Sequence, residues 1–168
     1  MDKDQLVSLV LNLYKAKLES KDYLDFFLNP DIDKRLKKAQ ASIDKAVYRS
    51  RRGVVKPKIT QVKNAVNSIS ALDPGDEYVV DIMIYAFIQY CSAGMWGRMN
   101  DATIKSIMKH LTDTIVFADK CGLSDKALPL LQNAIDQLKT DYMYRRDFKR
   151  NMEETLSQAI ANRTQIFR

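Results

Sequence analysis

The sequence predicts an all-α fold, in which a single helical domain over residues 1–168 contains seven or eight helices packed as antiparallel pairs, in a bundle or a short superhelical stack of the HEAT or TPR kind. Apolar residues recur every three or four positions along almost the whole chain. Gly and Pro are scarce, five and four residues, so few breakers interrupt the helices. No segment alternates with period two for long, and a hydrophobic content of 46% is sufficient for one core.

Two helices are expected before residue 29, the second of them short. The first begins at an N-cap Asp2 or Asp4, and the second is capped by Ser20. Each has one apolar face. These faces consist of Leu6, Leu9, Val10, Leu13 and Ala16 in the first helix and of Tyr23, Leu24, Phe27 and Leu28 in the second.

A third helix is expected over residues 31–52. It follows Asn29-Pro30-Asp31, which offers an N-cap, a proline at the first helical position and acids in the first turn. It should end near Arg52-Gly53, and residues 54–57 should form a linker. Its apolar seam is Ile32, Leu36, Ala39, Ile43, Val47 and Ser50.

The middle of the chain should provide the centre of the fold. A fourth helix has its seam at Ile59, Val62, Ala65 or Val66, and Ile69. A fifth helix, about 74–91, is apolar nearly all round and is therefore expected to be buried on most sides. Residues 92–100, with Gly94, Trp96 and Gly97, are expected to form a loop.

The C-terminal part should hold the remaining helices. A sixth helix follows the loop and is closed by Gly122. A seventh begins at Pro129 and an eighth near Asp147, with the junction near Tyr144. The last two segments are also compatible with one long helix.

The charge distribution is strongly local. From Lys34 to Lys58 there are ten Lys or Arg residues and one acid, Asp44, so this window carries +9 while the whole chain carries +6. On the third helix the cations fall opposite the apolar seam and form a ridge, with Tyr48 beside it. The candidate binding residues here are Lys34, Lys38, Lys45, Tyr48, Arg49 and Arg52. The ridge fits three interpretations: a solvated face, an acidic protein partner, or nucleic acid.

Two further features suggest binding. Residues 142–150 interleave tyrosine and phenylalanine with arginine and lysine, which suits base stacking, although helical spacing also places Tyr142 and Phe148 in a core. Trp96 is a candidate contact residue, because loops carry binding residues and Trp is frequent at hot spots; it also suits a plug against the core. No helix-turn-helix, zinc finger or RNP signature is present.

No catalytic constellation is recognisable. His110 is the only histidine, and Cys91 and Cys121 lack a supporting motif. Acidic pairs lie mostly where helix N-termini favour anions. We therefore expect no enzyme activity, no cofactor and no metal site. With no secretory signal, and a longest apolar stretch of Tyr78 to Ile88 interrupted by Asp81, we expect a cytoplasmic protein with reduced thiols and no membrane contact.

Five segments between residues 6 and 125 carry a resemblance to a known family. They are DYLDFFLNP at 22–30, the lysine-rich helix, KPK at 56–58, DIMIY at 81–85 and WGRMN at 96–100. The chain resembles an uncharacterised bacterial family of small helical proteins, a domain of unknown function found in Bacteroidetes-like sequences. The resemblance implies the helical fold and implies no activity.

The sequence thus favours a non-enzymatic interaction or regulatory protein, since helical stacks commonly bind partners. The alternative is a nucleic-acid-binding module that uses the helix at 31–52. An enzyme of unrecognised type is a third hypothesis.

Overall fold

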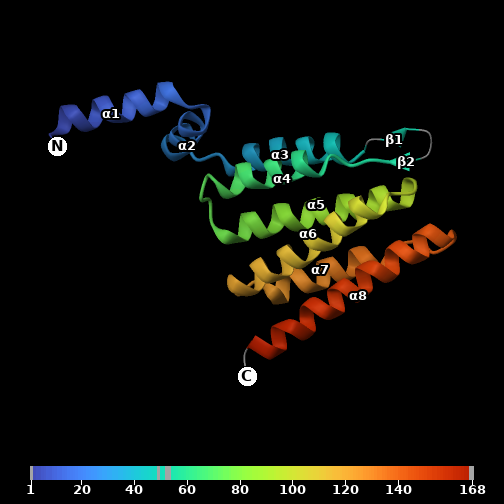
Figure 1. Ribbon diagram of the computed structural model, residues 1–168. Helices are drawn as coiled ribbons and strands as arrows, with labels where there is room; N and C mark the ends of the chain where they lie inside the picture. Colours follow the sequence, from blue (N-terminus) through green and yellow to red (C-terminus); the bar gives the residue numbers. More distant parts are fainter. Residues whose placement is uncertain (1, 49, 52–53, 167–168) are drawn as a thin grey trace.

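The computed structural model describes residues 2–48, 50–51 and 54–166. Within them the chain forms eight α-helices and one β-hairpin whose two strands have two residues each (Figure 1). The predicted all-α class and helix number are confirmed. The elements are α1 Lys3–Ala16, α2 Leu18–Leu28, α3 Ile32–Val47, β1 Ser50–Arg51, β2 Val54–Val55, α4 Ile59–Ser70, α5 Asp76–Trp96, α6 Asp101–Lys120, α7 Ser124–Asp136 and α8 Met143–Ile166.

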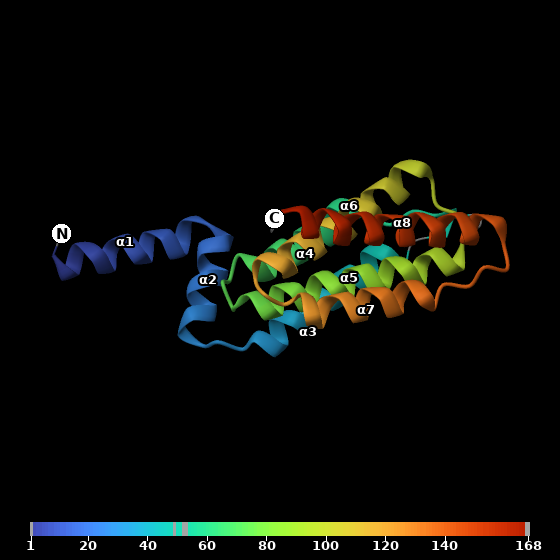
Figure 2. The ribbon, with the colours of Figure 1, turned by 90° about the horizontal axis from the view of Figure 1, so that it is seen from below.

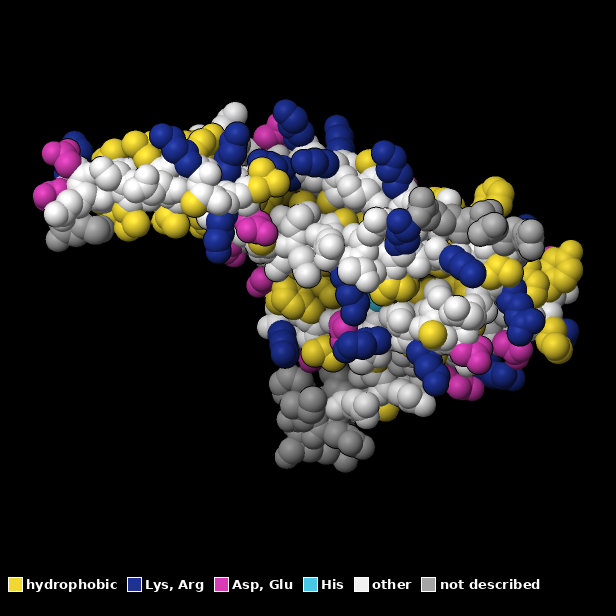
Figure 3. Space-filling model, turned by 45° about the horizontal axis from the view of Figure 1, so that its top comes forward, with side chains coloured by type: hydrophobic (Ala, Val, Ile, Leu, Met, Phe, Trp, Pro, Cys, Tyr) yellow, Lys and Arg dark blue, Asp and Glu magenta, His cyan; other side chains and the backbone are white. Residues whose placement is uncertain are grey.

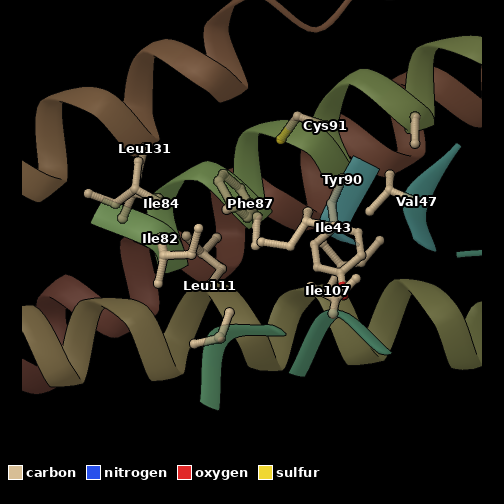
Figure 4. Close-up of a cluster of buried hydrophobic side chains, with 14 of the residues drawn as sticks. Ile43, Val47, Ile82, Ile84, Phe87, Tyr90, Cys91, Ile107, Leu111 and Leu131 are labelled. Atoms are coloured by element: carbon tan, nitrogen blue, oxygen red, sulfur yellow. The ribbon is translucent and has the colours of Figure 1, made fainter. Parts of the chain in front are cut away.

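Helix α5 lies at the centre of the bundle, as its apolar sequence predicts. It contacts α3 and α4 on one side and α6, α7 and α8 on the other (Figures 1 and 2). Phe87 and Tyr90 on α5 are among the largest fully buried side chains, and they point into the same cluster as Ile43 of α3 and Ile107 of α6 (Figure 4). Full burial of one such side chain contributes about 1.5–3 kcal/mol, so this cluster supplies much of the fold's stability.

The same helix has the length and apolar composition of a membrane span. Its most apolar window has a mean hydropathy of 1.3, and 56% of that window is buried inside the bundle. No other helix among the described residues has this combination of length and hydropathy. Five neighbouring helices bury α5, so its apolar sequence is that of a core helix.

The N-terminal boundaries differ from the sequence prediction in two places. Asp2 caps α1 as expected, and it forms a reciprocal capping box with Gln5. Ser20 does not cap α2, which begins after Lys17 without a side-chain cap. Asp31, not Asn29, caps α3 through a 3.0 Å hydrogen bond from the Lys34 backbone N–H.

Helix α3 is shorter than expected. Its last helical hydrogen bond runs from the Tyr48 N–H to the Asp44 carbonyl, so the helix ends at Val47; Arg52 and Gly53, where the end was expected, lie outside the described residues. The expected linker at 54–57 contains β2, whose residues pair with β1 in antiparallel register. Val54 and Val55 are β-branched and favour extended backbone, which a helix-periodicity argument overlooks.

Helix α5 is longer than expected, and residues 92–96 are not a loop. Gly94 lies inside this helix against the ring of Phe148 in α8, and a Cβ atom at position 94 would lie 2.7 Å from Phe148 Cε1. The glycine therefore permits a close helix–helix contact. Composition alone does not distinguish a glycine at such a contact from a glycine in a turn.

The C-terminal boundaries also shift. Helix α7 begins at Ser124 and contains Pro129 internally, so the expected start at Pro129 is wrong. Gly122, with φ of 70°, closes α6 as predicted. Residues 137–142 separate α7 from α8, which begins at Met143; the two segments are distinct helices rather than one.

Helices α1 and α2 form an arm that projects from the bundle. Figures 1 and 2 show α1 extending away from the other helices, with α2 crossing the end of the α3–α5 layer. None of the residues of α1 or α2 is buried. An ion pair of 3.3 Å between Asp22 and Arg35 ties α2 to α3.

Candidate partner-binding surface

Helix α3 presents a row of lysines on the side that faces away from the core. Ala39, Ile43 and Val47 are buried on its inner side. At about 100° per residue, the exposed lysines fall within roughly 100° of one another on the opposite side. We call this surface the α3 lysine face, and it consists of Lys34, Lys37, Lys38 and Lys45. Figure 3 shows Lys and Arg side chains gathered over this part of the molecule.

The lysine charges are not neutralised by their own helix. Among the described residues, no ion pair involves any of the four ammonium groups. Two of the three acids on this helix serve other groups: Asp31 caps α3, and Asp44 accepts a 2.9 Å hydrogen bond from the Tyr85 hydroxyl. The third, Asp33 in the first turn, forms no ion pair with these lysines among the described residues. Burial, followed by the bond to Asp44, raises the pKa of Tyr85 to about 12. The charge of the lysine face is therefore available to a partner.

A shallow, open groove lies beside the lysine face between α3 and α4, and most of its lining residues are polar. It has a volume of about 400 Å³ and contains no acidic residue. Its lining consists of Ser42, Lys45, Gln61, Asn64, Ala65 and Ser68. A smaller hollow of about 130 Å³ next to Lys38 includes Asp22 and Arg35, which neutralise each other. The hydroxyls of Ser42 and Ser68 donate to the Lys38 and Ala65 carbonyls, so the larger groove offers the amide groups of Gln61 and Asn64 beside the Lys45 ammonium group.

The other candidates on this helix have different surroundings. Tyr48 is half exposed, and its hydroxyl donates a 2.7 Å hydrogen bond to Gln89 Oε1 of α5. This bond fixes the ring along the bundle instead of leaving it free to stack. Arg49 and Arg52 lie outside the described residues. Lys37, which is not among the candidate residues predicted from the sequence, lies on the same face as the other three lysines.

Trp96 is exposed, and it ends α5 rather than lying in a loop. Its exposed fraction is 77%, so it is not a plug against the core. Trp96 does not line the groove between α3 and α4. It lies near the end of the bundle at which β2 pairs with Arg98, so it belongs to a different surface from Lys34.

The aromatic and basic segment at 142–150 is largely neutralised. Tyr142 and Tyr144 stack at 5.7 Å, and the Arg145 guanidinium lies over both rings. The same guanidinium donates to Asp141 and to the Met95 carbonyl, and its hydrogen bond lowers the pKa of Asp141. Two of the other three cations pair with carboxylates, Lys149 with Glu153 and Arg150 with Asp147 and Glu154, whereas Arg146 is exposed. Phe148 is buried as the periodicity predicts, whereas Tyr142 is exposed.

A second hollow of about 350 Å³ adjoins this segment. Its charged lining residues are Arg98, Asp101 and Asp147, so the acids outnumber the cation. The hollow lies between the ends of α5, α6 and α8, and the α3 lysine face is on the far side of α5 (Figure 1). The structure therefore does not bring the two basic segments onto one face.

The only histidine and both cysteines lie in settings that favour their neutral forms. His110 is buried with Nε2 2.9 Å from the Met83 carbonyl; because a carbonyl only accepts, Nε2 carries the proton. Burial lowers the pKa of His110. Burial also raises the pKa of the Cys91 thiol, and desolvation followed by Asp76 raises that of Cys121. The described residues contain no group of three or more His, Cys, Asp or Glu side chains placed to hold a metal ion.

One further surface is absent from the sequence-based candidates: the apolar α1–α2 arm. Six large aliphatic side chains of α1 are each 40–51% exposed, and Phe27 and Leu28 of α2 are 72% and 77% exposed. The periodicity indicates an apolar face on each helix, but a regular apolar face normally implies burial. The unusual absence of charge from Gln5 to Tyr14 is the signal in the sequence that could have drawn attention to this arm.

Comparison with known proteins gives one match. The model of a family of unknown function (DUF6155) matches residues 1–156. The chain belongs to this family. The DUF6155 match includes the arm, the lysine face and most of α8, so it extends beyond the 6–125 range of the resemblance seen in the sequence. No curated protein and no solved structure matches the chain.

Proposed function

We propose that this DUF6155 protein is a non-enzymatic interaction protein that docks its α3 lysine face on an acidic surface of a partner protein. The observation that carries the proposal is the row of four exposed lysines without carboxylate partners among the described residues. Lys34 to Lys45 span roughly 16 Å at about 1.5 Å per residue, the length of a typical protein–protein contact along one helix. The row is held rigid, because Ile43 and Val47 anchor α3 in the core.

The groove beside the lysines supports a protein partner. A carboxylate side chain of the partner that reaches an ammonium group of α3 also meets the side-chain amides of Gln61 and Asn64, whose N–H groups can donate to it. Hydrogen bonds to a charged acceptor are stronger than those between neutral groups. The lysines therefore attract an acidic partner by charge, and the groove orients the carboxylate that binds there.

Two observations favour an acidic protein over nucleic acid. The Tyr48 hydroxyl is bonded to Gln89, so the one aromatic residue on this helix does not stand ready to stack on a base. The second basic and aromatic segment lies across the bundle and pairs three of its four cations with acids. A nucleic-acid interface normally extends over a broader cationic surface.

The proposal is tested with labelled poly-L-glutamate and a labelled RNA of similar length, measured by fluorescence anisotropy over a salt series. We expect saturable binding of poly-L-glutamate that weakens steeply with salt. Changing Lys34, Lys38 and Lys45 to Glu should weaken it at least about tenfold, since three attractive charges become repulsive.

The matched control changes the same number of cations elsewhere, Lys105, Lys139 and Arg146, to Glu. These side chains are exposed and lie on α6, the α7–α8 connection and α8. Equal loss in the control would show that net charge, not the α3 lysine face, drives binding, and would contradict the proposal. Tighter binding of RNA than of poly-L-glutamate would replace the acidic protein by nucleic acid as the partner.

A further inference from the structure

Helix α1 is the least buried apolar element among the described residues. Its six large aliphatic side chains are all close to half exposed, and no residue of the helix is buried. The element against which it packs is α2, which itself buries nothing. Figure 3 shows hydrophobic side chains along both visible edges of the arm.

The apolar surface of α1 is too wide for a single neighbour. At about 100° per residue its apolar side chains cover roughly 220° of the circumference, against about 100° for an ordinary surface helix. The polar remainder holds Asp4, Gln5, Ser8, Asn12 and Lys15. A helix of this kind is stable only when other apolar elements cover it on two sides.

The arm has enough apolar area for a specific interface. Ten large apolar residues of α1 and α2 are 40–77% exposed: Leu6, Val7, Leu9, Val10, Leu11, Leu13, Leu18, Tyr23, Phe27 and Leu28. Together they present on the order of 1,000 Å², compared with about 800 Å² per partner in a standard interface. The largest apolar patch on a typical monomer is roughly 300–600 Å².

The charges of α1 fit a second copy in antiparallel orientation. The helix has Asp2, Lys3 and Asp4 at its start, a net charge of −1, and Lys15 and Lys17 at its end, with no charge from Gln5 to Tyr14. A two-fold axis between positions 9 and 10 would place residue n beside residue 19 − n of the other copy. Asp4 and Lys15, which lie next to Leu11 at the edge of the apolar surface, are then side by side across the axis, as are Asp2 and Lys17, and the two helix dipoles also oppose each other.

The same charges argue against a lipid surface. Helices that lie in a membrane interface carry several Lys or Arg residues on their polar face. The polar side of α1 has one cation, Lys15, and one acid, Asp4. At 14 residues, α1 is also shorter than the roughly 20 needed to span a bilayer.

We propose that the α1–α2 arm is a homodimer interface in which α1 of one copy packs antiparallel against α1 and α2 of the second copy. This inference uses residues separate from the α3 lysine face and does not depend on the proposed function. A two-fold dimer of this form covers the arm of each copy with the arm of the other, and it leaves both lysine faces free.

The first test is sedimentation equilibrium of the full-length protein over a broad concentration series. We expect a dimer for the wild type and at least roughly a hundredfold weaker association for Leu9→Lys/Leu13→Lys, because each dimer then buries four charges without partners. Because neither leucine is buried in one chain, far-ultraviolet circular dichroism should remain unchanged. A wild type that is monomeric at every concentration, or a dimer unaffected by these substitutions, would overturn the proposal.

The second test asks whether the pairing is antiparallel. Asp4→Lys and Lys15→Asp should each weaken the dimer by roughly threefold to tenfold, since each change places two like charges together twice per dimer. The double variant restores opposite charges across the axis and should recover most of the wild-type affinity. Additive weakening in the double variant would overturn the antiparallel arrangement, and the poly-L-glutamate measurement is unaffected by either result.

Discussion

The imidazole of His110 is a buried neutral group, and its titration should be visible in protein stability. Burial holds its pKa below the ordinary value of 6.5. An unfolded chain binds a proton at His110 near that ordinary value, whereas the folded chain does so only at lower pH. The unfolded state therefore gains protons first as pH falls, and stability is lost on the acidic side of this value.

We expect the free energy of unfolding to fall by up to about 1.4 kcal/mol per pH unit just below pH 6.5. His110→Gln should remove this slope, because an amide N–H can still donate to the Met83 carbonyl and does not titrate. Urea unfolding at several pH values measures the effect. His110 is the only histidine, so a wild type with no slope in this window would show that the imidazole is not held neutral by burial.

Gly94 should matter through its contact with Phe148 rather than through backbone flexibility. An added Cβ would lie 2.7 Å from the Phe148 ring, which costs about 1–3 kcal/mol as overpacking. The higher helix propensity of alanine returns about 1 kcal/mol, so Gly94→Ala should destabilise by about 1 kcal/mol net. Chemical denaturation measures this change.

A double-variant cycle separates the two effects on Gly94. In a Phe148→Leu background the obstructing ring is gone, so Gly94→Ala should become neutral or stabilising. A loss of the same size in both backgrounds would indicate that something other than the Phe148 ring requires the glycine.

For single residues, the sequence predicts whether a side chain is buried better than it predicts which residues that side chain contacts. The seam Ala39, Ile43 and Val47 is buried as periodicity predicts, and Gly122 closes α6. Gly94 was misassigned to a loop because its reason lies in α8, more than 50 residues away, and local composition carries no trace of that contact.

The helices differ in whether their apolar faces are buried or exposed. Leu11 of α1 is 51% exposed, and Leu111 of α6 is fully buried against α5. Leu111→Ala should cost about 2–5 kcal/mol, since it leaves a cavity in the core. Leu11→Ala should change stability by less than about 0.5 kcal/mol at concentrations where the protein is monomeric.

Thermal or urea unfolding of both variants at low concentration checks this contrast. Comparable losses at the two positions would mean that α1 packs against the bundle within one chain. That outcome would also remove the apolar surface on which the dimer inference rests.

Helix boundaries show why periodicity is an incomplete guide to elements. Proline commonly starts a helix, which predicts Pro129 as the start of α7, yet the chain is already helical from Ser124. The seam predicted for α3 extends from Val47 to Ser50, but β1 begins at Ser50 and pairs with β2, and Val54 of β2 also pairs with Arg98 just after α5. Tertiary pairing of this kind overrides local preference, and the sequence of one segment does not contain it.

Across the whole molecule, exposed apolar area and positive charge lie on separate surfaces. The arm carries exposed apolar area with little net charge, and the α3 face carries positive charge without apolar area. The bundle around α5 holds them apart (Figure 1). In our account, one surface joins two copies and the other binds an acidic partner, so a dimer presents two cationic faces.

The helical class and the central position of α5 are predicted correctly from the sequence, because each depends on local pattern or composition. The sequence did not foretell that the α1 face remains uncovered or that the segment at 142–150 is neutralised by Asp141, Asp147, Glu153 and Glu154. The exposure of α1 depends on which elements surround it in three dimensions. The pairing of the basic segment with acids on its own helix was readable from spacing.

The most direct test of the central claim is lysine footprinting of the native protein, with acetylation read by mass spectrometry in the presence and absence of poly-L-glutamate. We predict protection of Lys34, Lys37, Lys38 and Lys45, and unchanged reactivity at Lys105 and Lys109 of α6. Uniform protection of all exposed lysines, or protection centred on α8 instead of α3, would contradict the assignment of the α3 lysine face as the partner-binding surface.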